Sequence, residues 1–427
     1  MPESEAPTGR AAETIEPNPI HNTFWVRPAA EIDQDLATMR AAGPTFFSEP
    51  EIPPEIPLTR GPGAWVLTRH ADILQVSKNP QLFSSARGIT VTDQPPEFLE
   101  FFGSMISMDD PRHARLRRIV SAGFTPRMLK RLEDSVQLVA ASIVDDIAER
   151  GEVDFVTDVA ALLPLKIVCD LMGIPDSELQ FVFERSNVIL GAGDPEYVPE
   201  LGDIVTAILT AGSELAELMK QVAASKAGGN GEDLTTLLVN AELADDRLTD
   251  ADLASFFILL VVAGNETTRN ATSWGLKHLT DHPEQRAVWA EDFEGIAPTA
   301  VEEIVRLASP VTYMRRTVTE DTVIGNQPVA AGDKILMNYL AANRDESVFT
   351  DPLRFDVRRD PNPHVGFGGP GPHFCLGAHL ARREITVMFR ELFERLPDIH
   401  ATAEPDLLQA AFIHGIKHLP ARFTPAR

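Results

Sequence analysis

The chain has 427 residues, 44% of them hydrophobic and 24% charged, with a formal net charge of −25 at pH 7. This composition is typical of a folded globular protein and excludes a disordered or fibrous chain. The acidic balance argues against a nucleic-acid partner, because phosphate contacts need a basic surface. The two cysteines, Cys169 and Cys375, cannot form a disulfide framework, so a reducing cytoplasmic location fits best.

The N-terminal residues have the composition of a disordered tail. Residues 1–20 are polar, acidic and interrupted by prolines, and no basic segment is followed by an apolar one as in a signal peptide. We therefore expect a disordered acidic tail over residues 1–20.

The rest of the chain carries mostly helical patterns. Helical periodicity is strongest over residues 203–225, 252–279, 299–307 and 376–396. Strand-like stretches are shorter and occupy residues 61–70, 321–339 and 414–423, the second with a Gly325-Asn326 turn. We predict a mainly α protein with small β-sheets. The most apolar run, 254–264, falls short of the ~20 residues that cross a bilayer, so we expect no membrane span.

A basic helix is predicted after residue 111. Seven Lys and Arg residues and no acidic residue lie between Arg112 and Arg131. On a helical wheel Arg112, Arg115 and Arg118 point away from the side of His113 and Arg117. One face could bind an anionic group while the other meets a partner, although a solvated basic face explains the pattern equally well.

The helix predicted over residues 252–279 contains an unusual polar segment, "AGNETTRN", residues 263–270. Gly264 costs about 1 kcal/mol relative to alanine within a helix. The hydroxyl of Thr267 can bond the carbonyl of Ala263, four residues earlier. The preceding turns are apolar all round, which places Glu266 and Thr267 in a buried element; the alternative is the polar stripe of an amphipathic helix.

Two further features are ambiguous when taken alone. In "EEIVR", Glu303 and Arg306 lie on one helix face, a spacing typical of a weak surface ion pair. In "FGGPGPHFCLGA", residues 367–378, a helix is predicted to start just after Cys375, where backbone N–H groups and the helix dipole favour the thiolate. A lone cysteine is usually an inert buried residue, but the loop's glycines would let its backbone approach a flat partner.

The cysteine loop resembles the haem-binding loop of the cytochrome P450 family. The resemblance implies that Cys375 is the axial thiolate of the haem iron, and no CxxCH motif is present, so the haem would be non-covalent haem b. Phe367 lies one residue further from Cys375 than is commonest in the family. The loop positions that match and would contact the cofactor are Phe367, Gly368, Gly371, His373, Cys375 and Gly377.

Other motifs extend this resemblance. Glu266 and Thr267 are similar to the family's acid–alcohol pair, which would relay protons during O2 activation, with Ala263 and Gly264 lining the distal haem face. Glu303 and Arg306 match ExxR, whose third partner is best matched by Arg359 and less well by Arg358; these residues would hold the fold around the haem. The positions that match propionate-binding residues, through charge-assisted bonds, are His113, Arg117, Arg316 and His373.

The motifs span roughly residues 60–425, which implies the P450 fold, with haem between the acid–alcohol helix and the cysteine-loop helix, in one catalytic domain over residues 21–427. Segments such as "SFFILLVVAGNETTRNA" and "FIHGIK" look like bacterial members that hydroxylate methyl-branched lipids near the chain terminus. The implied substrate is a small apolar lipid: a methyl-branched fatty acid, an isoprenoid or a sterol side chain. The matching pocket positions, which equally suit core packing, are Ile258, Val262, Val311, Tyr313, Met314, Phe412 and Ile413.

The chain has no flavin or nicotinamide fingerprint, so a monooxygenase using O2 would need electrons from outside. The resemblance implies an iron-sulfur ferredoxin and an NAD(P)H ferredoxin reductase. Two alternatives keep the haem. A peroxide-driven peroxygenase would dispense with Glu266 and Thr267, and a non-catalytic haem-thiolate sensor or carrier would lack turnover.

Overall fold

The computed structural model describes residues 16–426 except 53, 55, 57, 124, 125 and 241–247. Residues 1–15 of the predicted tail therefore lie outside the described residues. Its last residues do not form a tail, because Asn18 and Ile20 are buried and Asn18 Nδ2 donates a 2.9 Å hydrogen bond to the carbonyl of Ser48. The predicted boundary at residue 20 is wrong, since the apolar side chain of Ile20 already packs into the core.

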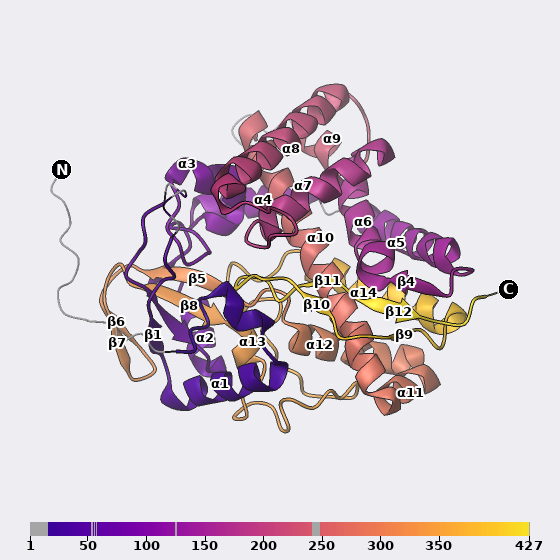
Figure 1. The fold of residues 1–427 in the computed structure, drawn as a ribbon. Helices are drawn as coiled ribbons and strands as arrows, with labels where there is room; N and C mark the ends of the chain where they lie inside the picture. The colour runs from indigo at the N-terminus through magenta and orange to yellow at the C-terminus, as the bar shows by residue number, and fades with distance from the viewer. Residues whose placement is uncertain are drawn as a thin grey trace.

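Helices dominate the fold and the strands are short (Figure 1), which confirms the predicted mainly α class. The helices are α1 (Ala29–Ala42), α2 (His70–Ser77), α3 (Pro96–Phe98), α4 (Arg112–Gly123), α5 (Pro126–Ile147), α6 (Leu162–Met172), α7 (Leu179–Gly191), α8 (Ile204–Lys226), α9 (Leu234–Val239), α10 (Asp250–Asp281), α11 (Pro283–Glu291), α12 (Phe293–Ala308), α13 (Tyr339–Ala342) and α14 (Ala378–Arg395). The strands are β1 (Thr45–Phe47), β2 (Ala64–Leu67), β3 (Phe83–Ser84), β4 (Glu152–Asp154), β5 (Tyr313–Val318), β6 (Thr322–Ile324), β7 (Gln327–Val329), β8 (Lys334–Asn338), β9 (His400–Ala401), β10 (Asp406–Leu407), β11 (Ile416–His418) and β12 (Pro420–Arg422).

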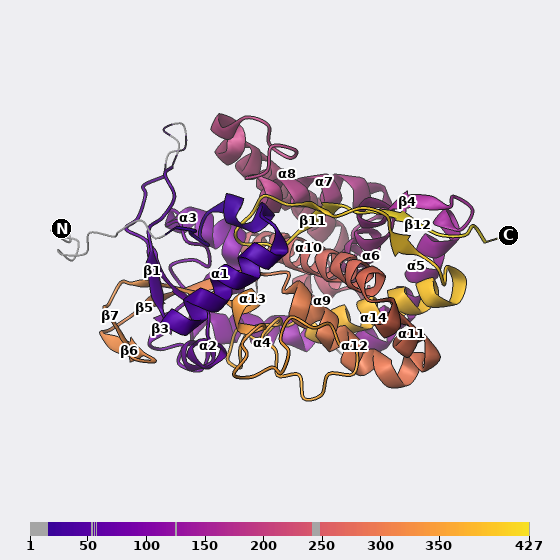
Figure 2. The ribbon, with the colours of Figure 1, turned by 60° about the horizontal axis from the view of Figure 1, so that its bottom comes forward.

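The largest sheet has the strand order β1-β2-β8-β5-β3, in which only β2 and β8 pair in parallel. A second sheet, β4-β12-β9, joins the C-terminal strand to the middle of the chain. Strands β6 and β7 form a hairpin in which Ile324 pairs with Gln327 across the predicted Gly325-Asn326 turn. The main sheet and the β6–β7 hairpin lie at one side of the molecule, whereas β4 and β12 lie among the helices at the other side (Figures 1 and 2).

Helix α10 runs through the centre of the helical part of the fold (Figure 2) and packs against α6, α7, α8, α12 and α14. Its start is defined by a capping box, in which the side chains of Thr249 and Asp252 each accept from the other's backbone N–H. Within the described ranges, α10 is the one helix long and apolar enough to cross a membrane. More than half of its most apolar segment is buried inside the protein. Its apolar character thus serves the core.

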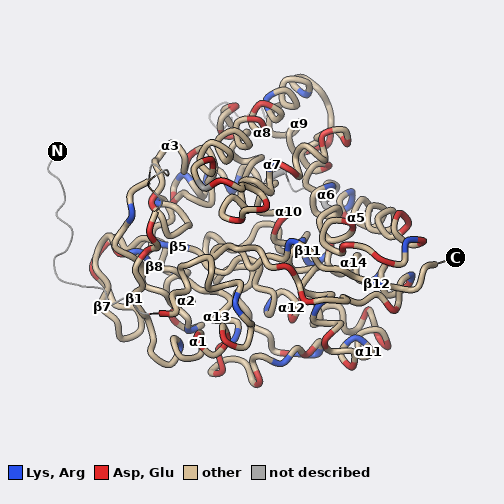
Figure 3. The backbone as a smooth tube through the Cα atoms, viewed as in Figure 1, with Lys and Arg blue, Asp and Glu red and all other residues tan. Residues whose placement is uncertain are grey.

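Helix boundaries follow the periodicity closely in three cases. Helices α8, α10 and α14 begin and end within two residues of the predicted positions. Helix α12 begins at Phe293 instead of Thr299, because the Asp292 side chain accepts the N–H of Gly295 and the helix accommodates Pro298 in its early turns. Asp and Glu are spread over most elements, so the acidic charge is not confined to one region (Figure 3).

Candidate active site

Cys375 lies in the loop that leads into α14, two residues before the N-cap residue Gly377. Its backbone N–H donates a 3.0 Å hydrogen bond to the carbonyl of Phe367, and the N–H of Phe374 donates to Gly371 at 3.2 Å. The loop therefore closes on itself despite the extra residue after Phe367. Cys375 keeps an accessible surface although protein groups surround it closely, whereas Cys169 on α6 is buried.

The electrostatics of Cys375 differ from the sequence-based expectation. Burial by the surrounding protein raises the pKa of the thiol, while hydrogen bonds from the N–H groups of Gly377 and Ala378 and the charges of Arg117 and Arg382 lower it. The predicted donors at the helix start are present, but desolvation outweighs them. Since a coordinating thiol loses its proton outright, these N–H groups still suit a metal-bound sulfur.

The loop glycines are used differently from our expectation. A Cβ on Gly369 would lie 2.4 Å from Ser77 Oγ, and one on Gly371 would lie 2.3 Å from the Ser77 carbonyl oxygen. The absence of a side chain at these two glycines lets the loop pack on the end of α2. Gly368 has a φ of 87°, which favours glycine, and a Cβ on Gly377 would meet nothing within 4 Å.

Four predicted propionate-binding residues come together beside this loop. The rings of His113 and His373 lie 4.2 Å apart. Burial and the charges of Arg316, His113 and Arg117 lower the pKa of His373 to about 3, and burial lowers the pKa of His113. Neither histidine therefore adds a positive charge at neutral pH, and His373 Nε2 lies 3.1 Å from Ser85 Oγ. Buried Arg316 donates to the carbonyl of Arg315, and Arg117 donates to that of Phe374.

This cluster fits an anionic group. Within the part of the chain that the structure describes, neither Arg117 nor Arg316 forms an ion pair with a carboxylate. Burying Arg316 without a paired carboxylate is costly, and the charge of nearby Asp109 offsets only part of that cost. The carboxylates of a cofactor would supply that charge, and Cys375, which keeps an accessible surface, and the open side of Gly377 lie in the adjoining loop.

The middle of α10 carries the acid and the alcohol. Thr267 Oγ1 donates to the carbonyl oxygen of Ala263 at 2.7 Å, as its spacing predicts. Ala263 is exposed although it lies in the central helix, so α10 has an open face at this point. A Cβ on Gly264 would lie 2.8 Å from Val168 Cγ2, so this glycine allows close packing on α6.

Glu266 does not share that open face. Its carboxylate is buried and accepts hydrogen bonds from Arg269 and, at 3.1 Å, from Asn270 Nδ2. Arg269 also donates to Asn187 Oδ1 on α7 at 2.9 Å. The acid is thus held in a buried ion pair with Arg269 (Oε1 to Nη2), a partner that the sequence analysis missed.

Glu303 and Arg306 form a fully buried ion pair, with Oε2 and Nε 2.7 Å apart, and not a surface pair. Arg359 Nε contacts both carboxylate oxygens of Glu303 at 3.1 Å, whereas Arg358 is exposed. Arg306 also donates to three carbonyl groups at the start of the segment that leads to the cysteine loop, those of Asn343, Pro352 and Arg354.

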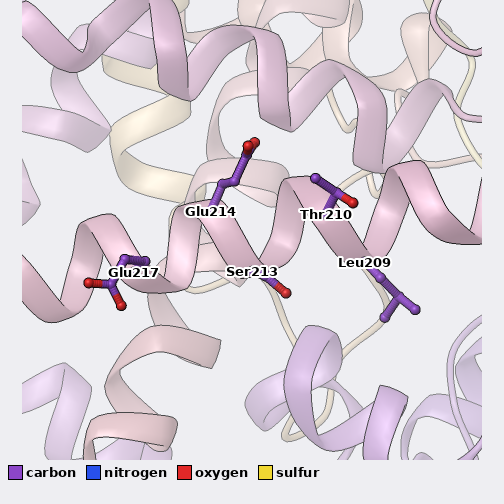
Figure 4. A pocket seen from close by; sticks show the side chains of 5 residues that line it. All are labelled: Leu209, Thr210, Ser213, Glu214 and Glu217. Carbon is purple, nitrogen blue, oxygen red and sulfur yellow. The ribbon is translucent and has the colours of Figure 1, made fainter.

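The predicted pocket residues fall into separate groups. Val311 and Ile413 form an isolated antiparallel β-bridge. The ring centroids of Tyr313 and Phe412 lie 5.5 Å apart, so the start of β5 and the C-terminal loop come together. Ile258 and Val262 belong to the larger core around α10, and Met314 packs with the residues of the main sheet. A shallow hollow elsewhere is formed entirely by α8 side chains and includes none of these residues: Leu209, Thr210, Ser213, Glu214 and Glu217 (Figure 4).

The sequence analysis also missed three residues beside the cysteine loop. Arg382 on α14 lies over the ring of Phe367, and Glu302 on α12 binds both Arg382 and His364. The available signal was the first acid of "EEIVR", Glu302, because only the second acid, Glu303, was assigned.

Comparisons with known proteins agree on one family. The cytochrome P450 family model matches residues 205–294 and 296–406. The methyl-branched lipid omega-hydroxylase of Mycobacterium tuberculosis is 48% identical over 405 residues, 94% of this chain and 93% of the relative. The steroid C26-monooxygenase of Mycolicibacterium smegmatis is 37% identical, covering 85% and 84%.

Solved structures give the same result. Mycobacterium marinum cytochrome P450 CYP268A2, in complex with pseudoionone, superposes with a TM-score of 0.90 at 41% identity, covering 97% of this chain and all of that one. The fold and the haem-thiolate type of site define a monooxygenase. The chain belongs to the cytochrome P450 family, whose members carry a haem with cysteine-ligated iron and use O2.

Proposed function

We propose that this protein is a cytoplasmic monooxygenase that hydroxylates a small apolar lipid near its chain terminus. The substrate would be a methyl-branched fatty acid, an isoprenoid or a sterol side chain. The observation that carries the proposal is the 48% identity, over 94% of the chain, to a methyl-branched lipid omega-hydroxylase. A relative named steroid C26-monooxygenase and a P450 that binds pseudoionone support an apolar chain as substrate.

Cys375 would ligate the iron of a non-covalent haem b. The propionates would be held by Arg117, Arg316, His113 and His373, which form the basic cluster beside the loop. When bound, the haem supplies the activation of O2 and the insertion of one oxygen atom into an unreactive C–H bond. Glu303, Arg306 and Arg359 would hold the segment before the loop without taking part in the chemistry.

Thr267 and Glu266 would supply protons. The Thr267 hydroxyl donates a hydrogen bond to the Ala263 carbonyl, which leaves its oxygen lone pairs free to accept a bond from water on the open face of α10. Glu266 is bonded to Arg269, so it would take part in the relay only after Arg269 turns away. This division of roles argues against a peroxide-driven peroxygenase, which would need neither side chain.

The substrate would meet the aromatic pair Tyr313 and Phe412 and the aliphatic side chains of Val311 and Ile413. Ile258, Val262 and Met314 would complete an apolar lining. The hydroxyl of Tyr313 accepts a 3.4 Å bond from the N–H of Val91, so this ring presents an apolar face. Such a lining binds a hydrocarbon by burying its apolar surface, and it offers few hydrogen-bonding groups to a polar molecule.

Electrons would come from an iron-sulfur ferredoxin, reduced by an NAD(P)H-dependent reductase. Arg112, Arg115 and Arg118 are exposed on the side of α4 opposite buried His113, as the helical wheel predicts. An acidic ferredoxin would dock there through complementary charge. Reversing Arg115 and Arg118 to glutamate should slow reduction without changing substrate affinity, and reduction that is unchanged across salt concentrations would contradict the docking site.

The carbon monoxide spectrum of the reduced protein tests the haem site. We expect a thiolate-type spectrum for the wild type and for Cys169→Ser, because Cys169 is buried on α6 with its pKa raised by burial to about 12. Cys375→Ser should lose that spectrum. If Cys375→Ser keeps it, the ligand assignment is wrong.

Substrate class is tested on the wild type by titrating branched fatty acids and sterols while watching the haem absorption band. Products are then identified with O2 and a reducing system, and separately with H2O2 alone. Terminal alcohols formed only in the first reaction are expected. Full activity with H2O2 alone would favour a peroxygenase, and binding without product would favour a sensor or carrier.

A further inference from the structure

Arg382 on α14 lies against the phenylalanine of the cysteine loop. Its guanidinium carbon is 4.3 Å from the centroid of the Phe367 ring, a distance at which a cation is attracted to an aromatic face. The carbonyl of the same phenylalanine accepts the N–H of Cys375 at 3.0 Å. Phe367 is therefore held at its backbone by Cys375 and at its ring by Arg382.

Arg382 is itself held by Glu302 of α12. Its Nε and Nη2 donate to the two carboxylate oxygens of Glu302, with Nη2 2.9 Å from Oε2, which is the bidentate geometry typical of arginine. His364 Nε2 lies 2.8 Å from the same Oε2, and His364 Nδ1 accepts the N–H of Gly366 at 3.1 Å, so the ring donates from Nε2. Burial would raise the pKa of Glu302, but these bonds outweigh it and lower the pKa to about 2.

This arrangement keeps a positive charge close to Cys375. Phe367 contacts both residues, Cys375 through its carbonyl and Arg382 through its ring, so the guanidinium lies one side chain away from the cysteine. An arginine that is free to change rotamer would spread its charge over a wide volume. Bonds to Glu302 and stacking on Phe367 confine it to one place.

We propose that Arg382, oriented by Glu302 and His364, is a positioning residue that tunes the thiolate of Cys375 and fixes Phe367 against it. The inference rests on the proposed function, in which Cys375 ligates the haem iron. A fixed positive charge beside the thiolate stabilises the reduced haem relative to the oxidised haem, so Arg382 would raise the reduction potential.

The same two helices provide a matched control. Arg390 on α14 donates to both carboxylate oxygens of Glu294 on α12 at 2.9 and 3.0 Å, and its guanidinium carbon lies 5.5 Å from the centroid of the Phe293 ring. Arg390 follows Arg382 by eight residues, about 12 Å along a helix. Its replacement removes the same kind of contact without touching the cysteine loop.

The test measures the haem reduction potential of Arg382→Gln, Arg382→Lys and Arg390→Gln by spectroelectrochemical titration of the haem-loaded proteins. For Arg382→Gln we expect the ratio of reduced to oxidised protein at a fixed potential to fall at least threefold, about 28 mV at 59 mV per tenfold. Arg382→Lys keeps the charge and should recover part of the shift. Arg390→Gln should match the wild type.

Each outcome decides the matter. A wild-type potential in Arg382→Gln, or an equal shift in Arg390→Gln, overturns the inference. If Arg382→Gln does not retain haem, Arg382→Lys is compared with Arg390→Lys, and equal potentials in that pair overturn it as well. A wild-type protein without a thiolate-type carbon monoxide spectrum defeats the proposed function, whereas a normal spectrum with unshifted potentials defeats only the role of Arg382.

Discussion

Replacing Glu303 with glutamine should destabilise the protein strongly. The side chains of Glu303 and Arg306 are fully buried, and the carboxylate also accepts from Arg359, from Asn362 and from the N–H of Asp356. Glutamine keeps the shape but leaves two guanidinium groups without their counter-charge, which costs about 3–5 kcal/mol. With an unfolding entropy of about 2.1 cal/mol/K per residue, or about 0.9 kcal/mol/K for the chain, the melting temperature should fall by about 3–6 °C.

Thermal unfolding of the haem-loaded protein, followed by circular dichroism, measures this effect. The control is Glu294→Gln on the same helix, whose ion pair with Arg390 leaves the glutamate 73% exposed. Breaking it should cost less than about 1 kcal/mol, or about 1 °C. If Glu303→Gln melts within that margin of Glu294→Gln, the reasoning from burial is refuted.

Two further predictions concern α10. Thr267→Ala should lower the amount of product formed per electron by about tenfold or more, with the difference recovered as H2O2. The control Thr272→Ala, which removes the same kind of bond to a carbonyl four residues earlier, should leave this ratio unchanged. An unchanged ratio of product to electrons in Thr267→Ala would exclude the relay. Burial, with Arg344 nearby, lowers the pKa of His278 to about 3. Below pH 6.5 this histidine is therefore protonated in the unfolded chain but stays neutral in the folded protein. Stability should therefore fall by about 1.4 kcal/mol per pH unit below pH 6.5 from this group. In urea unfolding, His278→Phe should lose less stability between pH 7 and 5 than the control His400→Gln, which replaces an exposed histidine.

Much of the fold follows from local pattern. The periodicity of α8, α10 and α14 predicts their ends because each has a continuous apolar stripe and clear end signals. The start of α12 was missed because Pro298 is a helix breaker in isolation, and the cap by Asp292 that precedes it was not weighed. The tail was drawn too long because composition does not show that Ile20 finds an apolar partner surface.

The site shows where local reasoning stops. Spacing alone predicted the bond from Thr267 to Ala263, since both lie on one helix. Arg269 lies three residues after Glu266 on the same helix, so this pair also fits the spacing although it was missed. Arg382, the partner of Glu302, lies on α14, and only the packing of helices brings these two residues together. Likewise, nothing in the loop sequence indicates that Gly369 and Gly371 face Ser77, because α2 is about 300 residues away in the chain.

Helix α12 carries two adjacent acids whose binding partners lie in different directions. Glu302 holds Arg382 and His364, while Glu303 holds Arg306 and Arg359. Successive side chains on a helix are about 100° apart, so turning α12 about its axis cannot improve one set of bonds without weakening the other. The helix is thus fixed in rotation, and inserting or deleting one residue ahead of this pair would misalign both networks at once.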